Sequence, residues 1–322
     1  MTRYLITGAA GFLGYYIASQ LADEAGSEVF CIDNFIRGES DTLYDALVSR
    51  ANVTHLTIDL NEQAAVRKIP TDFDVVFHMA ALNGTQNFYN RPFDVLRCCT
   101  LPTINLIEHL APSGFLKRFI YAGTSESYAS TVTRFNWPVP TSEDVPLCFD
   151  DVFNPRWSYG ASKMHGEVAT VSGCRHFSVP FTIVRFHNAY GPRMGDKHVI
   201  PDFLMRAKKG RYELFGHEDT RSFIYADDAA RATITLGATA AADGQVVNVG
   251  GEQEIMIGDL GRMMMTAAAL EGEIKLHPSP AGSVKRRAPA LDKLRALTNY
   301  RADVDLTEGL RRTADFYLNS AG

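Results

Sequence analysis

The chain has 322 residues, 46% of them hydrophobic and 21% charged, and a formal net charge of −5 at pH 7. This length can bury a large core in one or two closely joined domains, and the composition is that of a globular protein. The acidic balance, with no basic block, argues against nucleic acid as a partner. No uninterrupted apolar run approaches the ~20 residues of a membrane span, which argues against a membrane protein.

The five cysteines are Cys31, Cys98, Cys99, Cys148 and Cys174. An odd number without C-x-x-C spacing argues against a disulfide framework and against a zinc site, and we expect no metal. The simplest compartment is a reducing cytoplasm, with all five thiols buried or incidental.

The first 35 residues predict a dinucleotide-binding unit. Residues 4–7 have strand character, and residues 15–21 have apolar side chains at helical spacing. Between them lie three glycines, Gly8, Gly11 and Gly14, and a second apolar run ends at Asp33. A strand, a glycine turn, a helix, a second strand and an acid in this order are typical of that unit.

Each part of this unit has a physical role. Gly8 permits the tight turn, Gly11 lets a diphosphate approach the backbone, and Gly14 lets the helix pack closely on the sheet. The helix N-terminus offers free N–H groups and a partial positive charge, with Phe12 and Leu13 in its first turn. Asp33, followed by Asn34, suits a hydrogen bond to a ribose 2′-hydroxyl, whereas a 2′-phosphate would meet like charge, so we expect NAD rather than NADP.

Further strands are predicted at residues 53–58, 74–78, 119–121 and 181–185, and helices at about 95–110 and 159–170. Their alternation predicts an α/β fold, a Rossmann-type doubly wound parallel sheet with helices on both faces. Because ligands bind beyond the carboxyl ends of such strands, we expect Asp33, Asp59, His78 and Thr124 to line one crevice. The small residues Ala80 and Ala81 leave room there for the cofactor.

Regular alternation weakens in the second half of the chain. We expect residues 130–154 to cross the surface as a loop, and residues 223–225 and 246–249 to return to the sheet. The predicted domains are an NAD-binding Rossmann domain, 1–186 plus about 221–249, and a smaller C-terminal substrate-binding lobe, about 187–220 plus 250–322.

Tyr159 and Lys163 form a Y-x-x-x-K pattern, and residues four apart lie on one face of a helix. A free tyrosine titrates near ~10, but a nearby lysine and a positively charged nicotinamide ring would lower that value. Tyr159 would then serve as a base at neutral pH, with Thr124 sharing the substrate proton through a hydrogen bond. The alternative is a solvated Tyr–Lys pair on an ordinary helix.

Taken together, these motifs resemble those of the extended short-chain dehydrogenase/reductases of the nucleotide-sugar epimerase/dehydratase family. The similarity covers nearly the whole chain. Its further elements are Asp59-Leu60, His78-Met79-Ala80-Ala81, Thr124-Ser125-Glu126-Ser127-Tyr128, residues 185–193 and residues 221–228. The resemblance implies a tightly bound NAD, transient oxidation of a sugar hydroxyl at C4, and a homodimer formed through helices near 95–110 and 159–173.

The resemblance also implies roles for single residues. Asp59 and Leu60 would hold the adenine, and Lys163 would bind the nicotinamide ribose while Tyr159 acts as the base. The implied contacts to the nucleotide diphosphate sugar are Asn83, Asn188, Val199, Arg221 and one of Arg286 or Arg287. Guanidinium forks suit a diphosphate held in a cleft, although a solvated basic loop is the alternative for the last two arginines.

Glu126 bears on which reaction follows C4 oxidation. Epimerases similar to this chain usually carry a small or hydroxyl residue there, whereas a glutamate suits 4,6-dehydration or decarboxylation of a 4-keto uronic acid. Similar decarboxylases carry Thr-Ser-Glu, while many dehydratases have an aspartate where Ser125 stands. Family frequency favours an epimerase, with decarboxylase or 4,6-dehydratase using Glu126 as alternatives. A net 4-dehydrogenase or 4-keto reductase is an alternative of another class. The structural alternative for Glu126 is a carboxylate that only orders a loop.

Two segments depart from the commoner members of this family. Cys99 aligns with an asparagine beside the active site, and a cysteine cannot make the same hydrogen bonds. Residues 83–89 follow the fourth strand, and we interpret them either as a specificity loop near the sugar or as a surface loop. Both departures favour an uncommon sugar.

Overall fold

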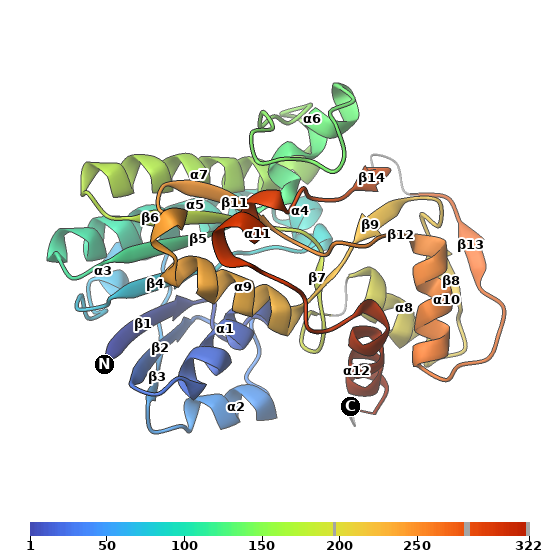
Figure 1. The fold of residues 1–322 in the computed structure, drawn as a ribbon, viewed down its shortest axis with the longest axis horizontal. Helices are drawn as coiled ribbons and strands as arrows, with labels where there is room; N and C mark the ends of the chain where they lie inside the picture. The colour runs from blue at the N-terminus through green and yellow to red at the C-terminus, as the bar shows by residue number, and fades with distance from the viewer. Residues whose placement is uncertain (196–197, 280–283, 320–322) are drawn as a thin grey trace.

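A computed structural model describes residues 1–195, 198–279 and 284–319 of the chain (Figure 1). Its centre is an all-parallel, seven-stranded sheet with the strand order β11-β6-β5-β4-β1-β2-β3. These strands are β1 Thr2–Thr7, β2 Ser27–Asp33, β3 Val53–Thr57, β4 Val75–His78, β5 Arg118–Thr124, β6 Phe181–Phe186 and β11 Gln245–Val249. The order reverses between β1 and β4, which is the topological switch point of a doubly wound fold.

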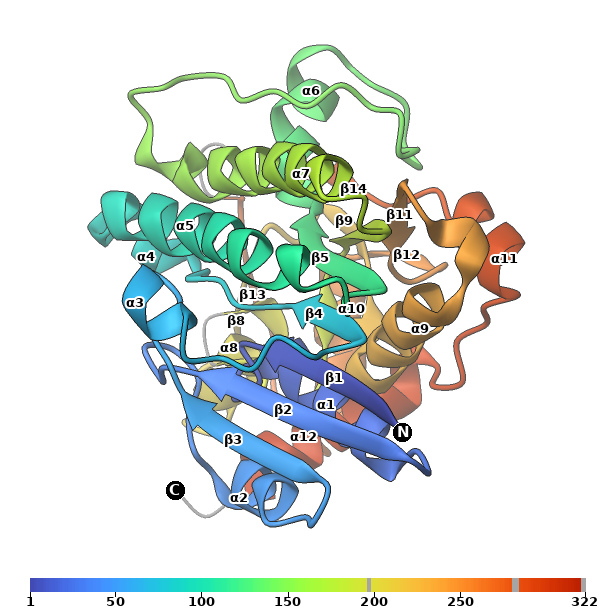
Figure 2. The ribbon, with the colours of Figure 1, turned by 90° about the vertical axis from the view of Figure 1, so that its left-hand side faces the viewer.

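The helices are α1 Phe12–Asp23, α2 Thr42–Val48, α3 Gln63–Val66, α4 Thr85–Asn90, α5 Pro92–Leu110, α6 Ala129–Arg134, α7 Ser158–His176, α8 Val199–Ala207, α9 Ala226–Ala238, α10 Ile257–Ala267, α11 Asp292–Thr298 and α12 Leu306–Asn319. One core cluster packs α1 and α9 against the sheet, and a second packs α5 and α7 against it. Figure 2 shows α5 and α7 side by side above the strands. The predicted Rossmann-type architecture is therefore confirmed.

The long helices begin earlier or end later than the sequence predicted. Helix α5 begins at Pro92, where proline's fixed φ and missing N–H are tolerated. Helix α7 continues to His176. Part of the predicted surface loop 130–154 is helical, because α6 covers Ala129–Arg134.

One predicted strand does not join the central sheet. Residues 224–225 form β10, which pairs only with the two-residue strand β7 Ala189–Tyr190. The edge that these residues could have extended is occupied by β11, which pairs with β6 along its whole length. The expectation that 223–225 returns to the sheet was therefore wrong, whereas that for 246–249 was right.

The C-terminal part surrounds a third core cluster, to which α8, α10 and α12 contribute. Short strands complete it: β8 Glu213–Phe215, β9 Thr220–Ser222, β12 Glu254–Met256, β13 Lys275–His277 and β14 Arg286–Arg287. Strand β9 lies between β12 and β14. The exact division of the chain into two domains stays a prediction.

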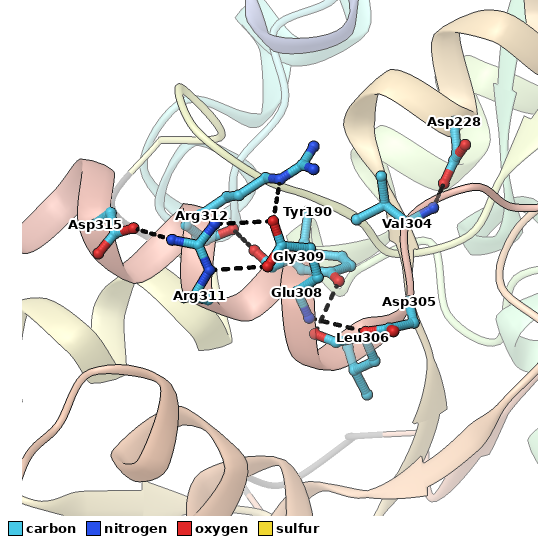
Figure 3. A network of polar contacts seen from close by, with 11 residues as sticks. Tyr190, Asp228, Val304, Asp305, Leu306, Glu308, Gly309, Arg311, Arg312 and Asp315 are labelled. Carbon is cyan, nitrogen blue, oxygen red and sulfur yellow. Dashed lines mark hydrogen bonds and ion pairs between the residues drawn. The ribbon is translucent and has the colours of Figure 1, made fainter.

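Asp228 attaches the last helix to the rest of the molecule (Figure 3). Its buried carboxylate accepts hydrogen bonds from the backbone N–H groups of Asp303 and Val304, both at 3.0 Å. The Tyr190 hydroxyl donates to the carbonyl of Leu306 at 3.3 Å. The N-cap of α9 is Tyr225, without a capping side chain, and Asp228 in the first turn of α9 fixes the approach to α12.

None of the described helices is long and apolar enough to cross a membrane. Among the described residues, no group of three or more histidine, cysteine or acidic side chains is arranged to hold a metal ion. All five cysteines are free thiols.

Candidate active site

A cavity of about 750 Å³ lies beyond the carboxyl ends of the central strands. Of the predicted site residues it is lined by Gly8, Gly11, Phe12, Leu13, Gly14, Asp33, Asn34, Asp59, Leu60, Ala80, Ala81, Asn83, Thr124, Ser125, Glu126, Tyr159, Lys163, Asn188 and Arg287. Residues from both halves of the chain thus meet at the switch point, where α/β sheets bind ligands.

The glycine turn is built as its spacing predicted. Gly8 has a φ of +67°, and a Cβ there would lie 2.8 Å from the backbone of Ala80. A Cβ on Gly14 would lie only 2.1 Å from the Gly8 carbonyl oxygen. Gly11 is the N-cap of α1 and contributes no capping side chain, so this helix end can offer its N–H groups to an anion.

Asp33 and Asp59 lie at the two places expected to contact the adenosine half of a dinucleotide. The buried Asp33 carboxylate accepts hydrogen bonds from the N–H groups of Ala10 at 3.0 Å and Phe35 at 2.8 Å. Asp59 accepts bonds from Asn61, whose own side-chain oxygen is buried without a partner. The close backbone packing at the glycines and this unpaired oxygen fit a bound NAD.

Tyr159 is held in place by neighbours on two sides. Its ring stacks on Phe88 of α4, with centroids 5.1 Å apart and planes inclined by 11°. The buried Lys163 ammonium donates a 2.8 Å hydrogen bond to the Ala122 carbonyl and lies 6.0 Å from the Tyr159 ring centroid. Helix α7 and strand β5 therefore bring the two predicted catalytic groups to the cavity together.

The ionisation of Tyr159 differs from our expectation. Burial raises the pKa of its phenol well above the ordinary value, and the charge of Arg37 opposes that rise. Burial also lowers the pKa of Lys163. Lys163 thus does not by itself make Tyr159 acidic, so the expected base would need a further positive charge, which oxidised NAD would supply when bound.

Glu126 is part of an ion-pair cluster. Its Oε1 lies 2.6 Å from Nη1 of Arg287, and its Oε2 lies 3.6 Å from Nη2 of Arg156. Burial disfavours ionisation of the Glu126 carboxyl, but the two guanidinium groups outweigh it, so that its pKa lies below the ordinary value. Glu126 is therefore an anion next to Tyr159 in the same cavity.

Three other predicted polar residues, Thr124, Asn188 and Asn83, differ in whether they have a hydrogen-bonding group left for a ligand. The Thr124 hydroxyl accepts a bond from the Glu126 N–H at 3.3 Å and can still donate. Asn188 donates to the Ser222 carbonyl at 2.9 Å. The side-chain oxygen of Asn83 is buried at the cavity without a partner, which leaves an acceptor for a ligand hydroxyl.

His78 does not line the cavity, although it follows a strand as Asp33 and Thr124 do. It is 1% exposed, and its ring nitrogens are hydrogen-bonded to Thr7 at 2.7 Å and Thr103 at 3.0 Å. Burial lowers its pKa to about 3. The expectation for His78 was wrong because a strand end does not determine which way the last side chain points.

Two predicted substrate contacts lie outside the cavity lining. Val199 packs against the third core cluster. Arg221 donates to the backbone carbonyls of Thr220 at 2.7 Å and Lys285 at 3.2 Å, and lies opposite Arg287 in the β9–β14 pair. Burial and the neighbouring charge of Arg287 lower the pKa of Arg221 to about 10. Their roles in binding stay predictions.

Several cavity residues escaped prediction from the sequence: Arg37, Cys98, Arg193, Met194, Phe316 and Tyr317. Phe316 and Tyr317 come from α12, well after the last predicted strand at 246–249, and no local sequence pattern indicates that this helix reaches the cavity. Arg193 belongs to the quoted 185–193 motif, so its position was available as a signal. Of the two segments that depart from the family, Phe88 in 83–89 stacks on Tyr159, and the Cys99 thiol donates only a weak bond to the Leu82 carbonyl.

Comparison with known proteins gives one family for most of the chain. Residues 4–250 match the NAD dependent epimerase/dehydratase family. Among curated proteins, the UDP-N-acetyl-alpha-D-glucosaminuronate decarboxylase of Bacillus cytotoxicus is 29% identical over 327 residues, covering 98% of this chain and 97% of that protein. The UDP-glucose 4-epimerase of Mycolicibacterium smegmatis is 27% identical over 327 residues, covering 99% of each chain.

A solved structure shares the whole fold. The UDP-glucuronic acid 4-epimerase of Bacillus cereus, in complex with UDP-glucuronic acid and NAD, superposes with a TM-score of 0.87. It is 25% identical in sequence, and the match covers 99% of each chain. The similar proteins thus include enzymes that act differently on similar sugars.

Proposed function

Because the chain belongs to the NAD-dependent epimerase/dehydratase family, we propose that it decarboxylates a nucleotide diphosphate hexuronic acid after transient oxidation at C4. The family uses NAD, and its members act as epimerases, decarboxylases or dehydratases of nucleotide sugars. The single observation that carries the choice is the ionised Glu126 held between Arg287 and Arg156 beside Tyr159.

The proposed first stage uses Tyr159, Lys163 and Thr124. Tyr159 takes the proton of the C4 hydroxyl, and Thr124 accepts or donates a hydrogen bond at the same oxygen. Lys163, fixed by the Ala122 carbonyl, orients the cofactor ribose. NAD, when bound, would supply the acceptor for the C4 hydride. The resulting 4-keto hexuronate is a β-keto acid.

The second stage is cleavage of the C5–C6 bond, which releases carbon dioxide and leaves its electron pair as an enolate at C4 and C5. Arg287 offers a guanidinium fork to the substrate carboxylate. The negative charge of Glu126 repels the substrate carboxylate. This repulsion weakens as the carboxylate becomes neutral carbon dioxide, so Glu126 raises the free energy of the ground state more than that of the transition state. A proton then returns to C5, and the hydride would return from the reduced cofactor to C4, which restores the C4 hydroxyl and the oxidised cofactor.

The state of Glu126 also bears on the alternatives. Dehydration needs a base strong enough to remove the C5 proton, and the low pKa of Glu126 makes it a weak base. It also needs an acid for the leaving hydroxyl, where this chain has Ser125. Simple 4-epimerisation needs neither group, so it leaves the Glu126–Arg287 pair without a role.

The test is to incubate the purified protein with UDP-glucuronic acid, UDP-N-acetylglucosaminuronic acid, UDP-glucose and dTDP-glucose, and to examine the products by mass and NMR. Loss of carbon dioxide from a hexuronate, with neither neutral sugar converted, is the expected result. Glu126→Gln should abolish this loss while NAD is still reduced on substrate addition. Isomerisation without a change of mass, or loss of water, would exclude the proposed reaction.

A second candidate is a uronic acid 4-epimerase, favoured by the whole-chain similarity to the Bacillus cereus enzyme. It shares the first stage but rotates the keto sugar and returns the hydride to the other face. The same panel separates the two, since an epimerised hexuronate keeps its mass. A net 4-dehydrogenase would instead accumulate reduced cofactor, visible by absorbance.

A further inference from the structure

Arg37 is a cavity residue that the proposed reaction does not use. It lies in the loop between β2 and α2 and lines the same cavity as Tyr159 and the glycine turn. Its side chain is exposed to that space. A charged side chain at a binding cavity normally has a counter-charge, so a guanidinium in this position indicates a negatively charged ligand.

The loop that carries Arg37 is fastened to the glycine turn at several points. A Cβ on Gly38 would lie 2.9 Å from the backbone of Ala10, so the two segments touch backbone to backbone. Asp33 bonds the N–H groups of both Ala10 and Phe35. On the far side, the buried Arg193 donates to the Ala10 carbonyl at 2.9 Å and pairs with Asp41. Arg37 is thereby held beside the glycine turn.

The guanidinium of Arg37 lies near Gly195, within range of a charge interaction with Tyr159. Its Nη2 lies 3.7 Å from the place of a Cβ on Gly195, and its charge interacts with the Tyr159 phenol. Arg37 therefore spans the region between Asp33, where one ribose is expected, and Tyr159, where the nicotinamide end is expected.

The charge of Arg37 is not compensated within the described part of the chain. None of the hydrogen bonds or ion pairs among those residues involves it, whereas the other two described arginines of the cavity are paired, Arg193 with Asp41 and Arg287 with Glu126. The first turn of α1 carries no basic side chain, so the glycine turn offers an anion only N–H groups and the helix dipole.

We propose that Arg37 binds the diphosphate of the dinucleotide beside the glycine turn, where its loop is held against Ala10. In a doubly wound fold that diphosphate crosses between the two riboses at the N-terminus of the first helix, which is the region Arg37 spans. A guanidinium fork matches its oxygens. The proposal rests on the family's cofactor and is independent of which sugar reaction follows.

This contact has a consequence for the catalytic cycle. An enzyme that returns its hydride to the same sugar must keep the reduced cofactor bound between the two half-reactions. Arg37 would slow the loss of NADH in that interval.

The test compares Arg37→Met with Arg37→Lys and with the control Arg262→Met, which removes an exposed arginine paired with Asp259 away from the cavity. Calorimetry with ADP-ribose and with UDP, and the NAD content retained after gel filtration, are the readouts. Arg37→Met should weaken ADP-ribose by about 10- to 100-fold, with a matching loss of retained NAD. Arg37→Lys should recover part of the affinity, and UDP binding and the control should be unchanged.

Unaltered ADP-ribose affinity and unaltered NAD retention in Arg37→Met would overturn the proposal. So would a loss confined to UDP, which would assign Arg37 to the sugar nucleotide. Because the side chain is exposed, the variant should keep the wild-type melting temperature. The Arg37→Lys variant keeps the positive charge. If it bound ADP-ribose no better than Arg37→Met, with an unchanged melting temperature, that result would also contradict the proposal.

Discussion

Glu126 shows how one residue couples the charge of the cavity to stability. Its pKa is below the ordinary 4.5, so its ion pairs contribute stability that is fully present above that value and is lost as the pH falls through the lower folded-state pKa. Replacing it leaves Arg287 and Arg156 facing each other without an anion.

We expect Glu126→Gln to lower the free energy of unfolding by about 1–2 kcal/mol at pH 7, and by progressively less as the pH falls below 4.5. Urea titrations of both proteins across this range measure the difference. Glu62→Gln is a matched control, because its partner Arg97 is on the surface. A difference that stays constant between pH 7 and the acid limit would show that the carboxylate contributes nothing through its charge.

Some single residues of the site could be predicted from the sequence, and others could not. Gly8, Gly14 and Tyr159 were predictable because spacing alone fixes a turn, a close approach and a helix face. His78 was not, since its side chain turns to Thr7 and Thr103 instead of the cavity. Arg37 was not either, because an arginine in a loop becomes informative only when its lack of a partner is visible.

At the scale of elements, Asp228 fixes the segment that leads into α12, and Glu308 supports the first turn of that helix from within. Asp228 is 1% exposed and accepts one backbone N–H with each carboxylate oxygen. Glu308 in the first turn of α12 pairs with Arg311 and Arg312 (Figure 3). The end of this helix supplies Phe316 and Tyr317 to the cavity wall.

We therefore expect Asp228→Asn to cost about 1–3 kcal/mol of stability, because an amide has one acceptor oxygen for two N–H donors. It should also raise hydrogen exchange at Asp303 and Val304. Asp227→Asn is the control, since its side chain is less buried and does not contact those residues. Equal stability of the two variants would mean that α12 is held by its apolar face alone.

The short elements around the cavity explain why the second half resisted prediction. Strands such as β7 and β10 have two residues each, too few for a periodic pattern. Their pairing is decided by the neighbours that the chain brings to them, here β11 at the edge of the sheet. The seven main strands, by contrast, are four to seven residues long and mostly apolar, and the sequence was sufficient to predict them.

At the scale of the whole molecule, α5 and α7 leave apolar side chains exposed. Phe93 is 76% exposed, Leu96 and Leu101 are each 38% exposed, and Val168 is 63% exposed. These helices pack against each other on the outside of the sheet (Figure 2). A homodimer through this surface, as the family resemblance implies, would cover them.

We expect the protein to be a dimer in solution and Val168→Glu to make it a monomer, since a buried unpaired charge is costly. Light scattering during gel filtration measures the mass. Val152→Glu, at a 76% exposed valine outside both helices, should remain dimeric. A monomeric wild-type protein, or a dimeric Val168→Glu, would place the contact elsewhere or remove it.

The central claim is that oxidation at C4 makes the C5–C6 bond of a hexuronate labile beside Glu126 and Arg287. Its most direct test is one incubation with UDP-glucuronic acid and with UDP-N-acetylglucosaminuronic acid in deuterated water, followed by NMR and mass analysis. The account predicts a product that has lost carbon dioxide and carries one deuterium at C5. A product of unchanged mass, with the hydrogen at C5 retained, would contradict it.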